Sequence, residues 1–368
     1  MAILPGSYFL PHSSFSKINF SIEEEIQNRL NQKTKPVGSL GKLEWLAVKM
    51  GIIQNTIRPK IVLPTLLIFA ADHGIAIEGV SAYPQEVTYQ MVLNFISGGA
   101  AASVLAKENN INLRIVDAGV NYDFGLIQNL ENEKIGHGTQ NFLYQPAMNE
   151  SEVLACLQSG ARIAKKVFSE GSNLLAFGEM GISNTSASSL LSQVLTGVSL
   201  HNLCGSGTGL DLSGVDKKRE ILEKSLKRFH SENSKPNLLD LLKNFGGFEI
   251  LMMTGAMLEA ASLSMIIVVD GFISTSAFLC AYFINPKILD YTIFSHQSTE
   301  RGHIYQLNYL GVEPILNLGL RLGEGTGTLL AIPILRSAVA ILNQMASFES
   351  AGVSNESIPN PVTNNLSK

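Results

Sequence analysis

A single carboxylate, Glu324, stands between two glycines in the segment RLGEGTGT (321–328), ahead of a long run with helical apolar spacing. Glycine has no Cβ, so such a stretch permits turns with positive φ and lets a ligand approach the main chain closely. A glutamate placed there could take a proton from a bound substrate. The alternative is a carboxylate at a helix N-terminus that only interacts with the helix dipole. The segment alone does not decide between the two interpretations.

The segment GEMGISNTS (178–186) combines a glutamate, Glu179, with hydroxyl and amide side chains, between an apolar run and a helix-like stretch of small residues. Backbone N–H groups at such a helix start could bind an anion such as a phosphate. An ordinary N-cap would explain one polar residue among Ser183, Asn184 and Thr185, but it does not readily explain the whole run. We therefore favour ligand binding for this segment.

A second glycine-rich segment, GSGTG (205–209), is a weaker signal. It lacks the lysine-serine ending of a loop that binds nucleoside triphosphates, and a poor strand precedes it. It could still contact a phosphate, with Lys217 or Lys218 supplying a cation. A solvated helix face explains both lysines equally simply.

Residues 81–91, SAYPQEVTYQM, could form a pocket for a flat aromatic ligand. Met91 would then be an adaptable apolar wall, because a thioether side chain fits irregular shapes. Ordinary packing in the core explains Met91 as well.

A hydrolytic metal site could be assembled from Asp72, His73, His296 and His303, since carboxylate and imidazole groups suit such ions. No two histidines have the spacing of ligands on one helix. Polar residues at strand ends commonly orient loops by hydrogen bonding, and we favour that explanation.

The elements that position these groups follow from apolar runs that end in a polar residue and glycine: 65–74, 113–119, 174–181 and 265–271, with 291–296 as a further candidate strand. Continuous hydrophobicity indicates strands buried on both faces, and the helix-like stretches between them predict βαβ units forming a parallel sheet. In open α/β sheets, ligands bind beyond the carboxyl ends of the strands. The polar residues expected there are Asp72, His73, Asp117, Glu179, Asp270 and His296.

The helices expected between and after these strands cover 85–96, 99–108, 152–170, 186–195, 217–228, 248–262 and 274–284. Both chain ends are helical in pattern without a convincing strand. We therefore expect a small helical domain from residues 1–60 and 326–353, and a large α/β domain from residues 61–325. The polar, proline-containing segment 354–368 predicts a flexible tail.

The chain has 368 residues, of which 45% are hydrophobic and 16% are charged, and a net charge of −4. This composition indicates a folded globular protein with a large core. The basic residues are scattered, so no nucleic-acid surface is expected. The longest apolar stretch, 61–71, is too short to span a bilayer, and the first residues lack the pattern of a secretory signal, which predicts a cytoplasmic protein with no membrane partner. The cysteines Cys156, Cys204 and Cys280 are far apart and predict buried thiols.

Seven ordered blocks resemble those of the nicotinate-nucleotide–dimethylbenzimidazole phosphoribosyltransferase family, over about residues 20–350. They are KPVGSLGKLEWLA (35–47), FAADHGIAIEGVSAYPQEVT (69–88), GEMGISNTSAS (178–188), GGFEILMMTGAMLEAA (246–261), VVDGFISTSA (268–277), FSHQSTERGH (294–303) and RLGEGTGT (321–328). The resemblance implies a Rossmann-like parallel sheet flanked by helices, a small helical domain built from both chain ends, and a homodimer.

The resemblance also implies the reaction, in which phosphoribose moves from nicotinate mononucleotide to 5,6-dimethylbenzimidazole. The products would be α-ribazole 5′-phosphate and nicotinate, with inversion at the anomeric carbon, for the lower ligand of cobalamin. No metal or redox cofactor is expected. Glu324 matches the family's proposed general base, and Glu179 matches a second active-site glutamate. One ring nitrogen of the benzimidazole attacks C1′ while the other must lose a proton, which a carboxylate within reach can accept.

Further site residues are carried over by position. Tyr83, Gln90, Met91 and Leu322 fall where the family lines the benzimidazole pocket. Gly181, Ser183, Asn184 and Thr185 fall beside the mononucleotide, and Lys218 aligns with a lysine near its phosphate. The segment 205–216 departs from the family pattern, because Ser206 replaces an arginine and Leu212 replaces an acid. Phosphate contacts there, and the preferred base, stay open.

Two other functions are compatible with parts of the sequence. A metal-dependent phosphohydrolase would use Asp72, His73 and His296. A non-catalytic nucleotide-binding protein would keep the fold without the reaction. Release of nicotinate in the presence of both substrates separates these possibilities from a phosphoribosyltransferase.

Overall fold

The computed structural model describes residue 15 and residues 19–355. The chain forms two compact units: a large unit that contains Ile61–Ile334, and a small unit that contains Asn19–Lys60 and the chain from Leu335 onward. Residues 326–334 belong to the large unit in this division. Most of the predicted flexible tail, 354–368, lies outside the described residues.

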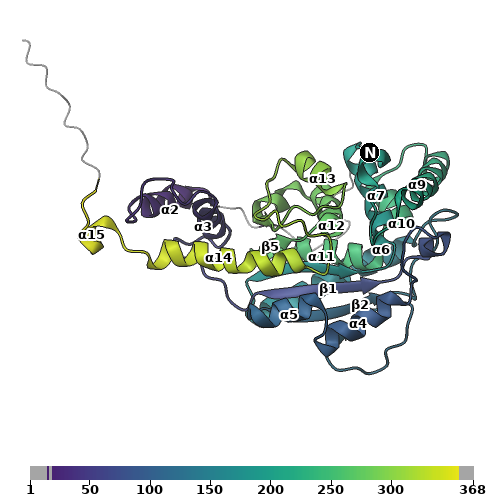
Figure 1. The fold of residues 1–368 in the computed structure, drawn as a ribbon, viewed down its shortest axis with the longest axis horizontal. Coiled ribbons are helices and arrows are strands. Elements are labelled where there is room, and N and C mark those ends of the chain that lie inside the picture. The colour runs from purple at the N-terminus through teal and green to yellow at the C-terminus, as the bar shows by residue number, and fades with distance from the viewer. Residues whose placement is uncertain (1–14, 16–18, 356–368) are drawn as a thin grey trace, which may run out of the picture. The chain divides into compact units, whose positions relative to one another are not determined.

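The large unit is built on a sheet of six strands in the order β3-β2-β1-β4-β5-β6 (Figure 1). The strands are β1 (Thr65–Ala71), β2 (Asn112–Gly119), β3 (Leu130–Asn132), β4 (Leu174–Met180), β5 (Ile266–Val269) and β6 (Thr292–Phe294). Every neighbouring pair is parallel. The predicted parallel α/β sheet is confirmed, and the short strand β3 is an addition to it.

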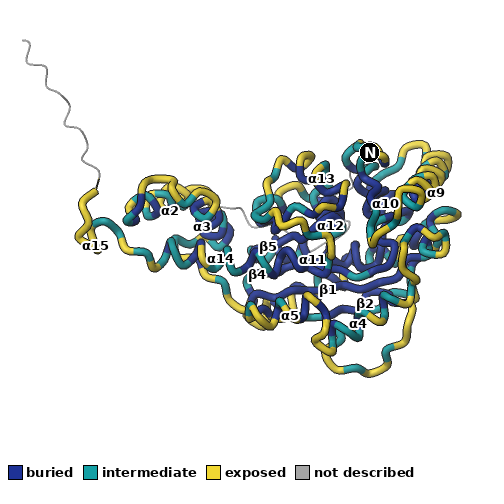
Figure 2. Tube along the Cα trace, in the orientation of Figure 1, coloured by how far each residue is buried: buried dark blue, intermediate teal, exposed yellow. Residues whose placement is uncertain are grey.

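The central strand β1 is buried along its whole length, as its uninterrupted apolar sequence TLLIFAA indicated. It is covered on both faces: α4 (Val87–Ser97) packs on one side and α11 (Phe248–Ser262) on the other (Figure 1). The dark-blue strands in Figure 2 mark this buried core, with exposed residues concentrated on the outer helices. Burial on both faces explains why the strands are continuously rather than alternately hydrophobic.

The seven helices expected between and after the strands are present; α11 has the predicted bounds, and the other six have shifted ends. Together with α4 and α11 these are α5 (Ala101–Glu108), α6 (Glu150–Ser169), α7 (Asn184–Thr196), α9 (Leu212–Glu232) and α12 (Phe272–Ile284). Helix α9 is longer than predicted because Asp211 Oδ1 accepts a hydrogen bond from the Gly214 N–H at 2.8 Å and so caps its start. The elements not predicted are α8 (Leu200–Leu203), α10 (Leu238–Phe245), α13 (His303–Leu310), and the 3-10 turns η1 (Gly74–Glu78) and η2 (Pro286–Tyr291).

Helices α6 and α11 pack with their backbones unusually close. A Cβ built on Gly160 would lie 1.9 Å from the Met252 carbonyl oxygen, and one built on Gly255 would lie 2.0 Å from the Leu157 carbonyl oxygen. Only glycine fits at both positions. This close contact fixes α11, whose first turn carries Glu249, beneath the carboxyl ends of the strands.

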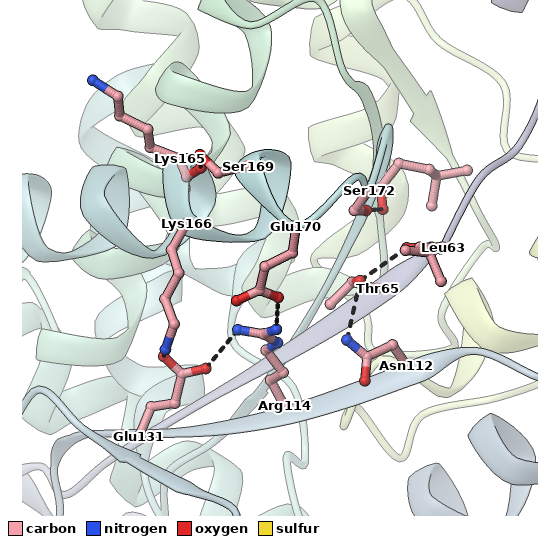
Figure 3. A network of polar contacts seen from close by, with 11 residues as sticks. Leu63, Thr65, Asn112, Arg114, Glu131, Lys165, Lys166, Ser169, Glu170 and Ser172 are labelled. Atoms are coloured by element: carbon pink, nitrogen blue, oxygen red, sulfur yellow. Dashed lines mark hydrogen bonds and ion pairs between the residues drawn. The ribbon is translucent and has the colours of Figure 1, made fainter.

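Near the amino ends of the strands, charged side chains tie the outer elements to the sheet (Figure 3). Arg114 on β2 pairs with Glu131 on β3 at 3.0 Å and with Glu170, which follows α6. Lys166 on α6 also pairs with Glu131 at 2.9 Å. These partly exposed pairs connect the sheet edge to α6, at the end opposite the carboxyl ends of the strands.

The small unit consists of α2 (Ser21–Asn31), α3 (Lys42–Ile53), the end of α14 (Thr326–Gln344) and α15 (Phe348–Ala351). Its two chain segments are joined by hydrogen bonds: Lys33 Nζ donates to the Met345 carbonyl at 2.6 Å, and Asn343 Nδ2 donates to the Pro59 carbonyl at 2.8 Å. A buried ion pair of 2.8 Å links Lys35 and Glu44.

Two stretches, Val87–Glu108 and Thr326–Gln344, are long and apolar enough to cross a membrane when judged by length and composition alone. Core helices of globular proteins meet the same criteria. The first stretch is interrupted at Gly98, where α4 ends in a left-handed residue, and the second is α14.

Candidate active site

A cavity of about 690 Å³ lies at the carboxyl ends of β1, β4, β5 and β6. The strand order reverses direction between β1 and β4, and in sheets of this kind ligands bind in the crevice at that point. Its walls come from loops that follow four strands and from the segment 319–324, which precedes α14. The cavity lies entirely within the large unit.

Glu324 lies in a strained turn at the edge of this cavity. Its φ is 60°, and the flanking Gly323 and Gly325 have φ values of 80° and 77°, so three successive residues are left-handed. For a residue with a Cβ this conformation costs roughly 1–2 kcal/mol. A Cβ built on Gly178 of β4 would lie 2.6 Å from the Glu324 carbonyl carbon. The turn is therefore pressed directly against the end of β4.

Glu324 is only 5% exposed, and it lines the cavity. The Ala102 N–H, in the first turn of α5, hydrogen bonds to its carboxylate, and its Oε2 has no partner among the described residues. Burial raises the pKa of Glu324, the Ala102 hydrogen bond lowers it, and the charge of Asp270 raises it further. A carboxylate with one unpaired oxygen and a raised pKa is suited to accept a proton.

Glu179, near the end of β4, is a second buried carboxyl group in the cavity wall. Burial raises the pKa of Glu179 to about 8, and the nearby carboxylates of Glu249, Asp270 and Glu324 act in the same direction. A hydrogen bond from Asn184 Nδ2 opposes this shift. Glu179 is therefore largely protonated at neutral pH.

The segment that joins β4 to α7 is held tightly against β1 and α4. A Cβ built on Gly181 would lie 2.5 Å from the Ala71 carbonyl oxygen, so the close approach requires glycine. The Ile182 N–H donates to Thr88 Oγ1 at 3.1 Å. Ser183 has a φ of 78°, and its buried Oγ has no partner among the described residues. Asn184 and Thr185 follow and line the cavity.

Lys218, on α9, lies behind Thr185 rather than on the cavity surface. Its side chain is buried, and Nζ donates to Thr185 Oγ1 at 2.7 Å. Burial lowers the pKa of Lys218, while Cys204 and Glu300 act to raise it. A Cβ built on Gly207 would lie 3.1 Å from Thr185 Oγ1 and 3.6 Å from Lys218 Nζ, so the loop 205–209 covers the lysine directly.

The loop 205–209 is connected to three other parts of the cavity wall. The Gly207 N–H donates to Glu300 Oε1 at 3.4 Å, and Arg321 donates to the Gly207 carbonyl at 3.3 Å. Thr208 Oγ1 lies 3.1 Å from Ser81 Oγ. Gly207 and Thr208 line the cavity. The guanidinium at this end of the cavity therefore comes from residue 321.

The outer part of the cavity is apolar and open. Tyr83, Met91 and Leu322 line it, and Tyr83 and Leu322 are more than half exposed. Gln90 is exposed and is not among the residues that line the cavity. Flat aromatic surfaces and a thioether can pack against a planar ring here.

Of the residues singled out from the sequence, the structure brings most into one cavity. Those that line it are Tyr83, Met91, Glu179, Gly181, Asn184, Thr185, Leu322 and Glu324. Ser183 and Lys218 lie behind the wall, and Gln90 lies outside it. Among the lining residues that the site prediction left out are Asp270, Phe272, Ser274, His296, Ser298 and Glu300. They follow β5 and β6. Asp270 and His296 had been expected at the carboxyl ends of the strands, because polar residues follow the apolar runs there, but no role was assigned to them.

The residues considered for a metal site interact with different partners outside that set. His73 Nε2 lies 2.7 Å from Glu249 Oε1, both side chains fully buried. Asp72 Oδ2 accepts from the Asn121 N–H at 2.8 Å, and His296 lies beside Asp270 at 3.5 Å. Among the described residues no group of three or more His, Cys, Asp or Glu side chains is arranged to hold a metal ion.

The arrangement favours a substrate with a cationic or proton-releasing ring. Three residues that carry carboxyl groups, Glu179, Asp270 and Glu324, line the cavity. Hydroxyls and glycine backbone of residues 185 and 207–208, with Arg321 and the buried Lys218, form the part suited to an anion. A ligand with a phosphate at one end and a nitrogen heterocycle at the other fits this division.

Comparisons with known proteins find similar sequences and a similar fold over most of the chain. A family model described as Phosphoribosyltransferase, DBI_PRT, matches residues 15–353. Nicotinate-nucleotide–dimethylbenzimidazole phosphoribosyltransferase of Dechloromonas aromatica (strain RCB) is 49% identical over 335 residues, which cover 91% of this chain and 96% of the relative. The enzyme of that name from Bacteroides fragilis (strain ATCC 25285) is 45% identical over 333 residues, covering 90% and 96%. The crystal structure of CobT from Thermus thermophilus superposes with a TM-score of 0.87 at 38% identity, covering 91% of this chain and all of that one.

Proposed function

The chain belongs to this phosphoribosyltransferase family, and from that membership we propose that its cavity carries out the reaction of the named relatives. It transfers phosphoribose from nicotinate mononucleotide to 5,6-dimethylbenzimidazole, giving α-ribazole 5′-phosphate and nicotinate for the lower ligand of cobalamin. The single observation that carries the assignment of roles is the position of Glu324, a buried carboxylate on a residue that lines the cavity, with an Oε2 that has no partner among the described residues.

In the proposed mechanism, one ring nitrogen of the benzimidazole attacks C1′ of the ribose from the face opposite the nicotinate. The C1′–N bond to nicotinate breaks, its electron pair neutralises the pyridinium nitrogen, and the configuration at C1′ inverts. Glu324 accepts the proton of the other benzimidazole nitrogen, so that the product is not left as a cation. A positioned general base of this kind contributes roughly 10²–10⁴ in rate.

Glu179 acts on the departing side in this proposal. Because burial raises its pKa to about 8, it is ready to lose a proton when a cation arrives beside it. The pyridinium ring of nicotinate mononucleotide is such a cation, and its charge favours the ionised form of Glu179. The ionised carboxylate then stabilises the positive charge that develops on the ribose. Asn184, which donates a hydrogen bond to Glu179, holds the group in place.

The remaining substrate contacts follow from the lining residues. Tyr83, Met91 and Leu322 pack against the benzimidazole ring, and Gln90 contacts the entrance from outside. Gly181, Ser183, Asn184 and Thr185 hold the mononucleotide, with Lys218 placing positive charge behind Thr185, where the phosphate would lie. The common cavity supports the assignments of its lining residues, and the hydrogen bond of 2.7 Å between Lys218 and Thr185 supports that of Lys218; Gln90 and Ser183 are carried over by position in the sequence alone.

The homodimer implied by the family resemblance, and the cytoplasmic location predicted from the sequence, are part of the same proposal. Light scattering of the purified chain tests the dimer: a mass of twice 39.8 kDa supports it, and a mass of 39.8 kDa contradicts it.

The experiment that tests the function is incubation of the pure protein with nicotinate mononucleotide and 5,6-dimethylbenzimidazole, followed by chromatography and mass spectrometry. Nicotinate and the new riboside phosphate should appear in equal amounts, and neither should appear when the benzimidazole is omitted. A phosphohydrolase would instead release inorganic phosphate and lose activity on chelation. A non-catalytic protein would bind nucleotide without product.

A further inference from the structure

Asp270 connects two parts of the cavity that are far apart in sequence. It follows β5, lines the cavity and is almost fully buried. Its Oδ1 accepts hydrogen bonds from the Gly327 N–H at 2.8 Å and the Thr328 N–H at 3.3 Å. Both donors lie in the first turn of α14, which begins at Thr326, two residues after Glu324.

The first turn of a helix has N–H groups without partners in the helix, and usually the side chain of the residue before it accepts one of them. Here the residue before α14 is Gly325, which has no side chain. A carboxylate from another element takes that role, and its negative charge also suits the positive end of the helix. Asp270 is thus a cap supplied from β5.

The segment that this cap holds is the strained one. Glu324 is left-handed, with left-handed glycines on both sides. The hydrogen bond from Thr326 Oγ1 to the Gly323 carbonyl, at 2.9 Å, is local to the turn. A strained conformation persists only where surrounding structure holds it. The Asp270 hydrogen bonds join the first turn of α14 to the end of β5, in addition to the backbone contact between Glu324 and Gly178 of β4.

The fit around Gly327 is too close for any other residue. A Cβ built there would lie 2.8 Å from Asp270 Oδ1 and 2.0 Å from His296 Cδ2. His296 Nε2 lies 3.5 Å from the same carboxylate oxygen, so the imidazole supports Asp270 from the side of β6. The backbone of α14 can therefore approach the carboxylate directly.

We infer that Asp270 is the positioning residue for Glu324: by capping α14 from the end of β5, it holds Glu324 in the conformation that faces the cavity. Asp270 acts on the reaction through Glu324. This inference rests on the proposed function, in which Glu324 is the base.

A double-mutant cycle tests the inference. The values of kcat and KM are measured for the wild type, Asp270→Ala, Glu324→Gln and the double variant, with each substrate varied in turn while the other is saturating. Misplacing a catalytic group by about an ångström costs roughly 100-fold, so Asp270→Ala should lower kcat by about 10- to 100-fold while KM changes little. In the Glu324→Gln background the same change should lower kcat by less than about twofold, because residues that act as a unit are not additive.

Two further variants separate positioning from a general loss of structure. Asp270→Asn keeps an oxygen that can accept from both N–H groups and should recover most of the lost turnover. Asn149→Ala removes the cap of α6, whose Oδ1 accepts from the Glu152 N–H at 3.0 Å, and should lower stability without changing kcat. Amide hydrogen exchange at residues 326–328 should be faster in Asp270→Ala than in the wild type.

Equal losses from Asp270→Ala in both backgrounds would overturn the inference, as would unchanged exchange at residues 326–328. If Glu324→Gln left turnover unchanged, the proposed role of Glu324 as the base would be wrong, whatever Asp270 does. The exchange measurement would then still decide whether Asp270 holds this segment.

Discussion

Gly178 and Glu324 meet backbone to backbone, so that a Cβ on Gly178 would lie 2.6 Å from the Glu324 carbonyl carbon and 2.7 Å from its carbonyl oxygen. One residue belongs to β4 and the other to the turn before α14. No side chain of the described residues lies between β4 and the turn at this contact. It sets how far the Glu324 carboxylate stands from the end of β4.

A Gly178→Ala variant should therefore lose turnover more than it loses stability. The added methyl group must push the turn outward and displace Glu324, and overpacking of this kind costs about 1–3 kcal/mol in unfolding free energy. We expect kcat to fall roughly 100-fold, the loss typical of a catalytic group displaced by about an ångström. Steady-state kinetics together with urea unfolding checks this, and wild-type turnover in a folded variant would contradict the described contact.

Glu179 should make the protein less stable as the pH rises. Its pKa is about 8 in the folded protein against 4.5 ordinarily, so between these values the folded chain holds a proton that the unfolded chain releases. Each pKa unit corresponds to about 1.4 kcal/mol. The stability of Glu179→Gln relative to wild type should rise from pH 4.5 to 8 and then level off.

Urea unfolding of wild type and Glu179→Gln across pH 4 to 9 measures that difference. Glu223→Gln, at an exposed position on α9, is the matched control for losing one carboxyl group. If the difference in unfolding free energy between wild type and Glu179→Gln did not vary with pH, burial would not raise the pKa of Glu179 as described.

Lys218→Met should weaken the binding of nicotinate mononucleotide. The lysine donates to Thr185 behind the proposed phosphate position, and losing a hydrogen bond that involves a charged group costs roughly 10- to 100-fold in affinity. Binding of dimethylbenzimidazole should change little. Isothermal titration with each substrate separates the two, and Lys217→Met, at an exposed neighbouring position, is the control. Equal weakening in both variants would contradict a specific role for Lys218.

His303 should stay neutral at mildly acidic pH. Its Nδ1 accepts from the Ser298 N–H at 2.9 Å, so the ring proton lies on Nε2 and faces Thr275 Oγ1 at 3.0 Å. Burial, with His296 nearby, lowers the pKa of His303 from 6.5 to about 3. Because the unfolded chain takes up this proton first, His303 reduces stability as the pH falls from 6.5 toward 3. Nitrogen NMR at pH 5 should show the neutral Nε2–H form, and titration near pH 6.5 would contradict it.

The strands could be predicted from the sequence because burial on both faces leaves a continuous apolar run, as in β1. The exception is β3, whose three residues Leu130–Asn132 carry two polar side chains and no such run. Helices α10 and α13 are eight residues each and were not predicted. The observed start of a helix differs from the predicted one where the capping residue precedes the apolar pattern. Asp211, which caps α9, is an example.

The site could be predicted in part for a physical reason. Glu324 was identifiable because its flanking glycines mark a turn of special backbone conformation, and the left-handed φ values agree. The hydrogen bond from the Gly327 N–H to Asp270, which joins the start of α14 to the end of β5, links residues 57 positions apart, and local spacing cannot indicate it. The pKa of Glu179 depends on burial and on three other carboxylates, and these meet only in the folded chain.

The most direct test of the central claim is the single-turnover rate of Glu324→Gln with saturating nicotinate mononucleotide and dimethylbenzimidazole. The substitution removes the proton-accepting carboxylate and keeps its size. We expect the rate to fall by roughly 10²–10⁴ with both dissociation constants unchanged, while Glu220→Gln, at an exposed position, reacts at the wild-type rate. A Glu324→Gln rate equal to that of the wild type would contradict the account.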